Sequence, residues 1–300
     1  MRSGKPSRTA LKVAMNVVSL GAKPGMEQVL PDGIVEATAR LLVASGAASA
    51  TAVRLAGSRR MVSLYGTIDW LMPGQFVAFA QRKAFYERQV RGAIAAGAAQ
   101  VLVLGAGYDT LTWRLAPDFP GVRFFEIDHP ATARLKAAGI QSLGARPNLT
   151  LIAADLGQER LETVLTADPS WDSDARTVAV AEGLVMYLPE ASVEGLFRQL
   201  RAASGPDSRV AFSFIPAGGD GRLDAGRLTG FLLRLQRLIG EPWLWSIRPR
   251  DLAAFLESVG WSLDTDATDL ATRHGLELFA AAVRGSHGIG HDPGRRGGVR

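Results

Sequence analysis

Between residues 98 and 216, short apolar runs alternate with stretches whose apolar residues recur at helical spacing. Each run has the length of a strand, and each intervening stretch is long enough for a helix. The runs predict strands at 101–104, 122–128, 149–156, 177–184 and 209–215, and two more near 261–263 and 276–283. This alternation indicates an α/β fold with a mostly parallel sheet that helices cover on both faces.

The first 97 residues predict helices. A first helix begins near Ser7, and a second runs from Ile34 to about Ser45. The apolar positions of residues 76–97 fit one face of a third helix, with Gly97 at its end. We therefore expect residues 1–97 to form an N-terminal helical region that packs on the core of a domain spanning 98–284.

Residues 217–248, called the lid segment below, interrupt the alternation. They combine Gly-rich polar sequence, an amphipathic helix and the aromatic sequence EPWLW at 241–245. Their apolar side chains predict either the wall of a hydrophobic substrate pocket or a packed cap over the edge of the sheet. The candidates for a substrate lid are Phe231, Leu235, Trp243 and Trp245. After the last strand, residues 285–300 lack apolar periodicity and predict a disordered tail.

The composition is that of a soluble globular protein, with 47% hydrophobic and 21% charged residues. The chain has no Cys and four His, which argues against thiolate and histidine-rich metal sites, so no metal is expected. The net charge of +5 arises at the ends, because residues 1–12 carry +4 and residues 284–300 carry +3. The remaining body, at −2, predicts no nucleic-acid partner.

The apolar stretch VAMNVVSLGA near the N-terminus has only a superficial likeness to a signal peptide, because Asn16 and Ser19 interrupt it. No uncharged run is apolar enough to cross a bilayer. We expect a cytoplasmic protein with no membrane partner. The sequence does not indicate an oligomeric state.

Glycines and carboxylates follow the first four predicted strands, at the sheet edge where open parallel sheets bind their ligands. They are Gly105, Ala106, Gly107, Asp128, Asp155 and Glu182. The three acids are spaced 27 residues apart, which is about one strand–helix unit. This spacing predicts that all three lie along one edge of the sheet.

The glycine turn alone is weak evidence for a nucleotide, because Thr110 stands where the dinucleotide fingerprint has its third Gly. Asp128, about 20 residues later, is able to bind both hydroxyls of a ribose, or to cap the next helix. The nearby Asp109 disfavours the pyrophosphate of a nicotinamide cofactor. An acidic edge instead suits S-adenosylmethionine, which carries hydroxyls, amines and a sulfonium, and Arg82 is a candidate partner for its carboxylate.

The segments QVLVLGAGYDTLTWRL (100–115), FFEIDHP (124–130), AADL (153–156) and EGLVMYLPE (182–190) together resemble the leucine carboxyl methyltransferase family. SRTALKVA (7–14) and EPWLWSIRPRDLAAFLESVGW (241–261) extend the similarity to residues 7–284. The resemblance implies a Rossmann-like class I methyltransferase sheet with an antiparallel last strand. It also implies that S-adenosylmethionine is bound by Arg82, Gly105, Asp128, Asp155, Leu156 and Glu182, with Lys12 matched more loosely. Leu111 departs from the Arg of many bacterial relatives.

These observations predict an S-adenosylmethionine-dependent O-methyltransferase that acts on a carboxylate or hydroxyl of a small, hydrophobic metabolite. Tyr187 and His129 are candidates for positioning this acceptor, but neither is a convincing base, which favours a carboxylate acceptor because a carboxylate needs no base. A nicotinamide-dependent oxidoreductase and a non-catalytic methyltransferase-like binding protein are the alternatives. Eukaryotic members of the family methylate the C-terminal carboxylate of a protein phosphatase.

Overall fold

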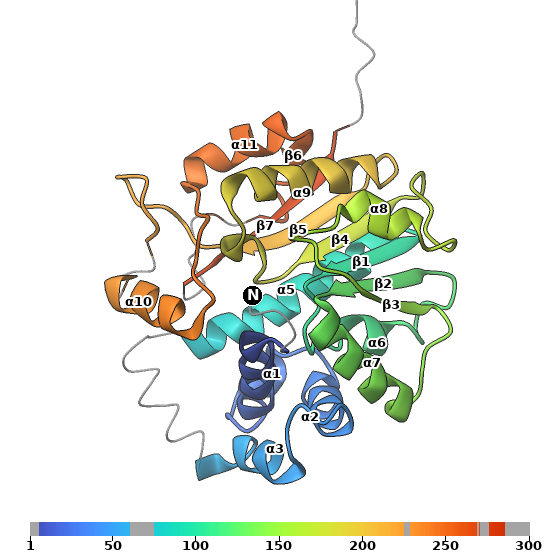
Figure 1. Ribbon diagram of the computed structural model, residues 1–300, viewed down its shortest axis with the longest axis vertical. Helices are drawn as coiled ribbons and strands as arrows, with labels where there is room; N and C mark the ends of the chain where they lie inside the picture. Colours follow the sequence, from blue (N-terminus) through green and yellow to red (C-terminus); the bar gives the residue numbers. More distant parts are fainter. Residues whose placement is uncertain (1–5, 61–74, 225–228, 269, 271–275, 286–300) are drawn as a thin grey trace, which may run out of the picture.

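The computed structural model describes residues 6–60, 75–224, 229–268, 270 and 276–285 (Figure 1). Seven strands form one sheet in the order β3-β2-β1-β4-β5-β7-β6. The strands are β1 (Gln100–Leu104), β2 (Arg123–Asp128), β3 (Leu149–Ala153), β4 (Thr177–Ala181), β5 (Arg209–Phe214), β6 (Trp261–Leu263) and β7 (Leu278–Arg284). β7 runs antiparallel to β5 and β6, whereas β1 to β5 pair in parallel. The predicted α/β class, with a mostly parallel sheet and an antiparallel last strand, is confirmed.

Helices cover both faces of this sheet, because successive residues of each buried strand point to opposite faces. Val101 and Val103 pack with α5 (Gln75–Ala95) and α6 (Leu111–Leu115) on one face. Leu102 and Leu104 pack with α8 (Leu161–Thr166), α9 (Glu190–Ala202) and α11 (Leu252–Ser258) on the other. Figure 1 shows these two helical layers on either side of the strands.

The N-terminal helices α1 (Arg8–Leu20), α2 (Ile34–Ala44) and α3 (Ala50–Ala56) share an apolar cluster with α7 (Pro130–Leu143). Ser7 caps α1, since its side chain accepts a hydrogen bond from Ala10 N at 3.1 Å. The backbone N–H of Ser7 also donates to Thr132 Oγ1 at 3.1 Å. These contacts attach the start of α1 to the start of α7, beside the carboxyl ends of the central strands (Figure 1).

The lid segment leaves β5 and returns at the same place, since Pro216 bridges Ile247 and Ala217 N donates to Ile247 O at 3.0 Å. Within it lies α10 (Thr229–Ile239), and the 3-10 helix η3 (Pro249–Asp251) follows it. Trp245, a lid candidate, is only 4% exposed and packs against Phe214 and Phe255. Its ring lies between β5 and α11, so the structure places Trp245 in the core, as the packed-cap interpretation expects.

Two predicted strands end earlier than expected. β3 ends at Ala153 and β4 at Ala181, three residues before the ends of the apolar runs. After β4 the chain turns at Gly183, with φ of 58°, into the 3-10 helix η2 (Val185–Tyr187). The sequence pattern also missed α3 and the 3-10 helix η1 (Met26–Gln28). No helix in the described ranges is long and apolar enough to cross a bilayer.

Candidate functional site

The carboxyl ends of β1 to β4 bring the predicted glycines and acids to one edge of the sheet. β1 lies between β2 and β4, so Asp128 and Glu182 flank the glycine turn at residues 105–107. β3 adjoins β2 and places Asp155 next along the edge. The sheet order therefore brings the three evenly spaced acids and the glycine turn to one edge.

The glycine turn is packed too closely for side chains. Gly105 and Gly107 have φ values of 63° and 52°, which L side chains rarely adopt. A Cβ atom on Gly105 would lie 3.2 Å from Leu184, and one on Gly107 would lie 3.0 Å from Ala10 of α1. The turn therefore requires Gly at both positions, and Gly105 is the exposed one of the two.

Asp128 is positioned by this turn. Its Oδ2 atom accepts a hydrogen bond from Gly107 N at 2.5 Å. Burial raises the pKa of Asp128, and this hydrogen bond and the charge of Lys136 act in the opposite direction. Lys136 itself is buried and pairs with Glu126 Oε2 at 2.6 Å, which ties α7 to β2 directly behind Asp128.

Arg82 of α5 is buried between two carboxylates. Its Nε atom lies 3.0 Å from Glu182 Oε1, and its Nη1 atom donates to Glu277 Oε1 at 2.6 Å. Burial opposes the charge of the guanidinium, but Glu277 and Glu182 outweigh it and raise the pKa of Arg82. The guanidinium also lies 4.7 Å from the ring of Phe79. Arg82 is therefore held, charged, at the end of β4.

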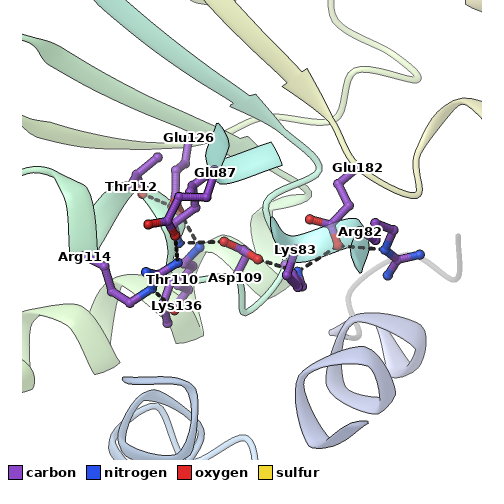
Figure 2. Close-up of polar contacts among 12 residues, drawn as sticks. Arg82, Lys83, Glu87, Asp109, Thr110, Thr112, Arg114, Glu126, Lys136 and Glu182 are labelled. Atoms are coloured by element: carbon purple, nitrogen blue, oxygen red, sulfur yellow. Dashed lines mark hydrogen bonds and ion pairs between the residues drawn. The ribbon is translucent and has the colours of Figure 1, made fainter. Parts of the chain in front are cut away.

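Lys83 continues the same network toward β1, as Figure 2 shows. Its Nζ atom lies 2.7 Å from Glu182 Oε1 and also contacts Asp109 Oδ2. The second oxygen of Asp109 accepts a hydrogen bond from Leu111 N at 2.6 Å, at the start of α6. Burial disfavours the charged form of Asp109, yet the charges of Lys83 and Lys136 and the hydrogen bonds from Lys83 and Leu111 N together outweigh burial and lower the pKa of this carboxyl. Cations and carboxylates therefore alternate along the edge.

The depressed pKa of Asp109 predicts a pH-dependent contribution to stability. The contribution is present above the unfolded-state pKa of about 3.9 and is lost as the pH falls toward the lower folded-state value. We expect Asp109→Asn to destabilise the protein by about 1.5–3 kcal/mol at neutral pH, through loss of a charge-assisted hydrogen bond. The deficit should shrink below about pH 4, as measured by denaturant unfolding at several pH values. Asp118→Asn, at an exposed site, is the control; a deficit independent of pH would contradict this account.

The other site candidates are spread around this network. His129 caps α7, because its Nδ1 atom accepts from Ala131 N at 3.4 Å, and its Nε2 atom lies 4.0 Å from Asp155 Oδ2. Asp155 accepts hydrogen bonds from Gly157 N at 3.0 Å and Gln158 Nε2 at 2.9 Å. Leu156 packs against the core, whereas Lys12 is exposed on α1.

A small apolar cluster, called the lid cluster below, lies where the lid segment meets the sheet edge. Buried Met186, Ile215 and Leu232 form it, and Tyr187, Leu223, Trp243 and Leu276 pack against it. Phe231 is 59% exposed on α10, and the side chain of Leu235 lies outside the described residues. Burial raises the pKa of Tyr187, an effect that contact with Trp243 reduces. The cluster therefore combines an apolar surface with a protonated phenol.

The family model for leucine carboxyl methyltransferases matches residues 26–201. The chain belongs to the leucine carboxyl methyltransferase family. A relative from Mycolicibacterium paratuberculosis is 31% identical over 71% of this chain and 70% of its own length. One from Mycobacterium tuberculosis is 33% identical over 67% of this chain and 58% of its own length. Both are described as candidate S-adenosyl-L-methionine-dependent methyltransferases.

A solved structure from Thermobifida fusca, described as that of a candidate methyltransferase, shares the fold of this family member. The TM-score is 0.58 with 19% identity, and the match covers 88% of this chain and 98% of that one. The family resemblance of the sequence and the class I methyltransferase fold are thereby confirmed. The protein is an S-adenosylmethionine-dependent methyltransferase, with S-adenosylmethionine as its methyl donor.

The chemistry of the sheet edge fits this donor. The turn at residues 105–107 exposes Gly105, which has no side chain to block a closely approaching ligand. Carboxylates suit hydroxyl and amine donors, and a buried guanidinium suits a carboxylate. Among the described residues, no group of three or more His, Asp or Glu side chains is arranged to hold a metal ion. A cavity of about 390 Å³ beside α5 is lined by none of the candidate residues.

The sequence reasoning missed two residues of the charged network around Arg82 and Glu182, namely Lys83 and Glu277. Lys83 follows Arg82 on the face of α5 that carries Phe79 and Tyr86, so a charged pair on an otherwise apolar helical face was the available signal. Glu277 is the charged residue at the start of the apolar run of the last strand. Only the position of β7 in the sheet brings it to Arg82.

Proposed function

We propose that this methyltransferase transfers the methyl group of S-adenosylmethionine to an oxygen of a small, hydrophobic metabolite. The observation that carries the proposal is the contact between two different environments at one sheet edge. Charged groups of Arg82, Lys83 and Glu182 lie on the side of β1 and β4. The lid cluster, which includes Met186 and Tyr187 of η2, lies beside them, and its apolar side chains would contact an acceptor.

The chain's own residues would hold the donor at the strand ends. Asp128 would accept hydrogen bonds from the ribose hydroxyls, and Asp155 with Leu156 would contact the adenine. Arg82 would bind the carboxylate of the methionine part, and Glu182 would face its amino group. The donor supplies an activated methyl group. The protein contributes orientation and exclusion of water, which together lower barriers by about 7–11 kcal/mol in well-oriented reactions.

Asp128→Ala should weaken the binding of S-adenosylhomocysteine by more than about tenfold, because each charge-assisted hydrogen bond contributes about 1.5–3 kcal/mol. The fold should survive, since Asp128 is half-buried at a strand end. Isothermal calorimetry measures the affinity and the melting temperature reports the fold. Asp118→Asn, at a 56% exposed side chain, is the control. An unchanged affinity in folded Asp128→Ala protein would contradict the assignment.

Transfer of labelled methyl groups tests the proposed activity. The protein is incubated with S-adenosylmethionine labelled in its methyl group and a low-molecular-weight metabolite extract, and mass spectrometry identifies what gains the label. Label on an oxygen of an apolar metabolite supports the proposal. Label on nitrogen or carbon, or on a macromolecule, would contradict the proposed acceptor class. Binding of S-adenosylmethionine without methyl transfer would favour a methyltransferase-like binding protein.

A further inference from the structure

Glu277 immediately precedes β7 and has two oxygens in different situations. Oε1 accepts the hydrogen bond from Arg82 Nη1 at 2.6 Å. Oε2 is fully buried, and no side chain or backbone group of the described ranges donates a hydrogen bond to it. The whole side chain is 13% exposed. A buried carboxylate oxygen without a donor costs free energy, so this oxygen indicates a hydrogen donor outside the described residues, and a bound acceptor is able to supply one.

Glu277 lies between the charged network and the lid cluster. Its neighbour Leu276 packs against Met186, Ile215 and Leu232 of that cluster, together with Trp243. On the other side, Arg82 joins Glu277 to Glu182. Glu277 is therefore the neighbour in sequence of a residue that packs on the lid cluster, and it is paired with the cation of the charged network.

The phenols near Glu277 are not available as bases. Burial raises the pKa of Tyr86 and of Tyr187, and the negative charge of Glu277 raises both further. Both therefore stay protonated at neutral pH. Glu241 also faces Tyr187, but its Oε1 atom already accepts a hydrogen bond from Ser7 Oγ at 3.4 Å. Glu277 differs from Glu241 in that its second oxygen, Oε2, is buried and accepts no hydrogen bond from the described residues.

The charge at this position also discriminates between acceptors. Arg82 and Lys83 balance much of the charge of Glu277 and Glu182, but a carboxylate acceptor placed against Oε2 of Glu277 would still set two ionised carboxylates side by side in a poorly solvated place, where they repel each other. A hydroxyl is neutral and donates a hydrogen bond to a carboxylate. The sequence favoured a carboxylate acceptor because it offered no recognisable base. Glu277 is a candidate base, so a hydroxyl acceptor no longer lacks one.

We infer that Glu277 is a catalytic residue that accepts the proton of an alcohol or phenol acceptor; the inference rests on the proposed function. The acceptor oxygen forms a bond to the methyl carbon of the donor as the carbon–sulfur bond breaks, with its electron pair going to sulfur. The hydroxyl proton passes to Oε2 of Glu277 and then to solvent. The products are a methyl ether, S-adenosylhomocysteine and one proton.

The test compares wild-type protein with Glu277→Gln, Glu277→Asp and the control Glu257→Gln, which alters an exposed residue of α11. Each is incubated with methyl-labelled S-adenosylmethionine and the low-molecular-weight metabolite extract. Treatment with mild alkali then distinguishes the two kinds of product, because methyl esters release labelled methanol and methyl ethers do not. Calorimetric binding of S-adenosylhomocysteine and the melting temperature are measured on every variant, and the rate of transfer is followed against pH.

We expect alkali-stable label and a loss of about 10²–10⁴ in the transfer rate of Glu277→Gln, as removal of a general base produces. S-adenosylhomocysteine affinity should stay within about threefold of wild type. Glu277→Asp should recover part of the rate, and the acidic limb of the pH profile should disappear in Glu277→Gln.

Alkali-labile label would overturn the inference while leaving the methyltransferase proposal intact. An undiminished rate in Glu277→Gln would overturn it too. A loss of S-adenosylhomocysteine affinity as large as the loss of rate would show that Oε2 serves the amino group of the donor instead. Absence of transfer by wild-type protein that binds S-adenosylhomocysteine would overturn the proposed function, and the inference with it.

Discussion

Replacing Arg82 with Met is expected to destabilise the protein by about 3–5 kcal/mol and to abolish measurable binding of S-adenosylhomocysteine. The stability loss follows because Glu277 would lose its buried cation, and Glu182 would keep only Lys83. The binding loss follows because Arg82 is the proposed partner of the ligand's carboxylate. Denaturant unfolding and calorimetry measure the two effects separately.

Arg82→Lys separates stability from binding if the Met variant unfolds. Lys keeps the charge but lacks the planar fork that reaches both carboxylates, so it should fold and bind S-adenosylhomocysteine more weakly than wild type. Arg198→Met is the matched control, because Arg198 forms an exposed i,i+4 pair with Glu194 at 3.0 Å on α9. Such pairs contribute about 0.3–0.5 kcal/mol. If Arg82→Met binds S-adenosylhomocysteine with wild-type affinity, Arg82 does not bind the ligand's carboxylate.

Trp245→Ala should cost about 3–5 kcal/mol of stability, as the truncation of a buried aromatic residue does. The ring centroid lies 5.4 Å from that of Phe255 and 6.4 Å from that of Phe214. Met186 O accepts hydrogen bonds from Leu244 N at 2.7 Å and Trp245 N at 3.3 Å, which fixes the backbone here. Every activity of the protein should fall together with the folded fraction.

Trp243→Ala provides the comparison, because Trp243 is half-buried in the lid cluster two residues away. It should lose less stability and should raise the KM for the acceptor, with S-adenosylhomocysteine affinity unchanged. Melting temperature, calorimetry and acceptor kinetics on both variants decide the matter. If Trp245→Ala keeps its stability and has a raised KM for the acceptor, Trp245 lines the substrate pocket after all.

The α/β architecture was predictable because buried parallel strands produce continuous apolar runs. Phe124, Phe125 and Ile127 belong to one such run and are all buried in β2. Polar residues at the ends of the runs then indicate the edge of the sheet where the strands' carboxyl ends meet, and Asp128 and Glu182 both lie at that edge. Strand ends were less predictable: the strand predicted over 177–184 ends at Ala181, because the chain turns away from the sheet at Gly183.

Contacts between segments that are distant in the chain could not be predicted from the sequence pattern. Glu277 meets Arg82 across 195 positions of the chain because β7 inserts between β5 and β6, an order that no local pattern encodes. The aromatic sequence at 241–245 had two interpretations, and the structure separates its members. Trp245 enters the core beside Phe214, while Trp243 stays with the lid cluster.

Calorimetric titration of the wild-type protein with S-adenosylhomocysteine, and separately with NADH, tests most directly whether the sheet edge is a methyl-donor site. The acidic edge formed by Asp109, Asp128 and Glu182 disfavours a pyrophosphate, while the glycine turn and Arg82 suit an amino-acid-bearing nucleoside. The account predicts saturable binding of one S-adenosylhomocysteine per chain and no detectable binding of NADH. Binding of NADH with no affinity for S-adenosylhomocysteine would contradict it.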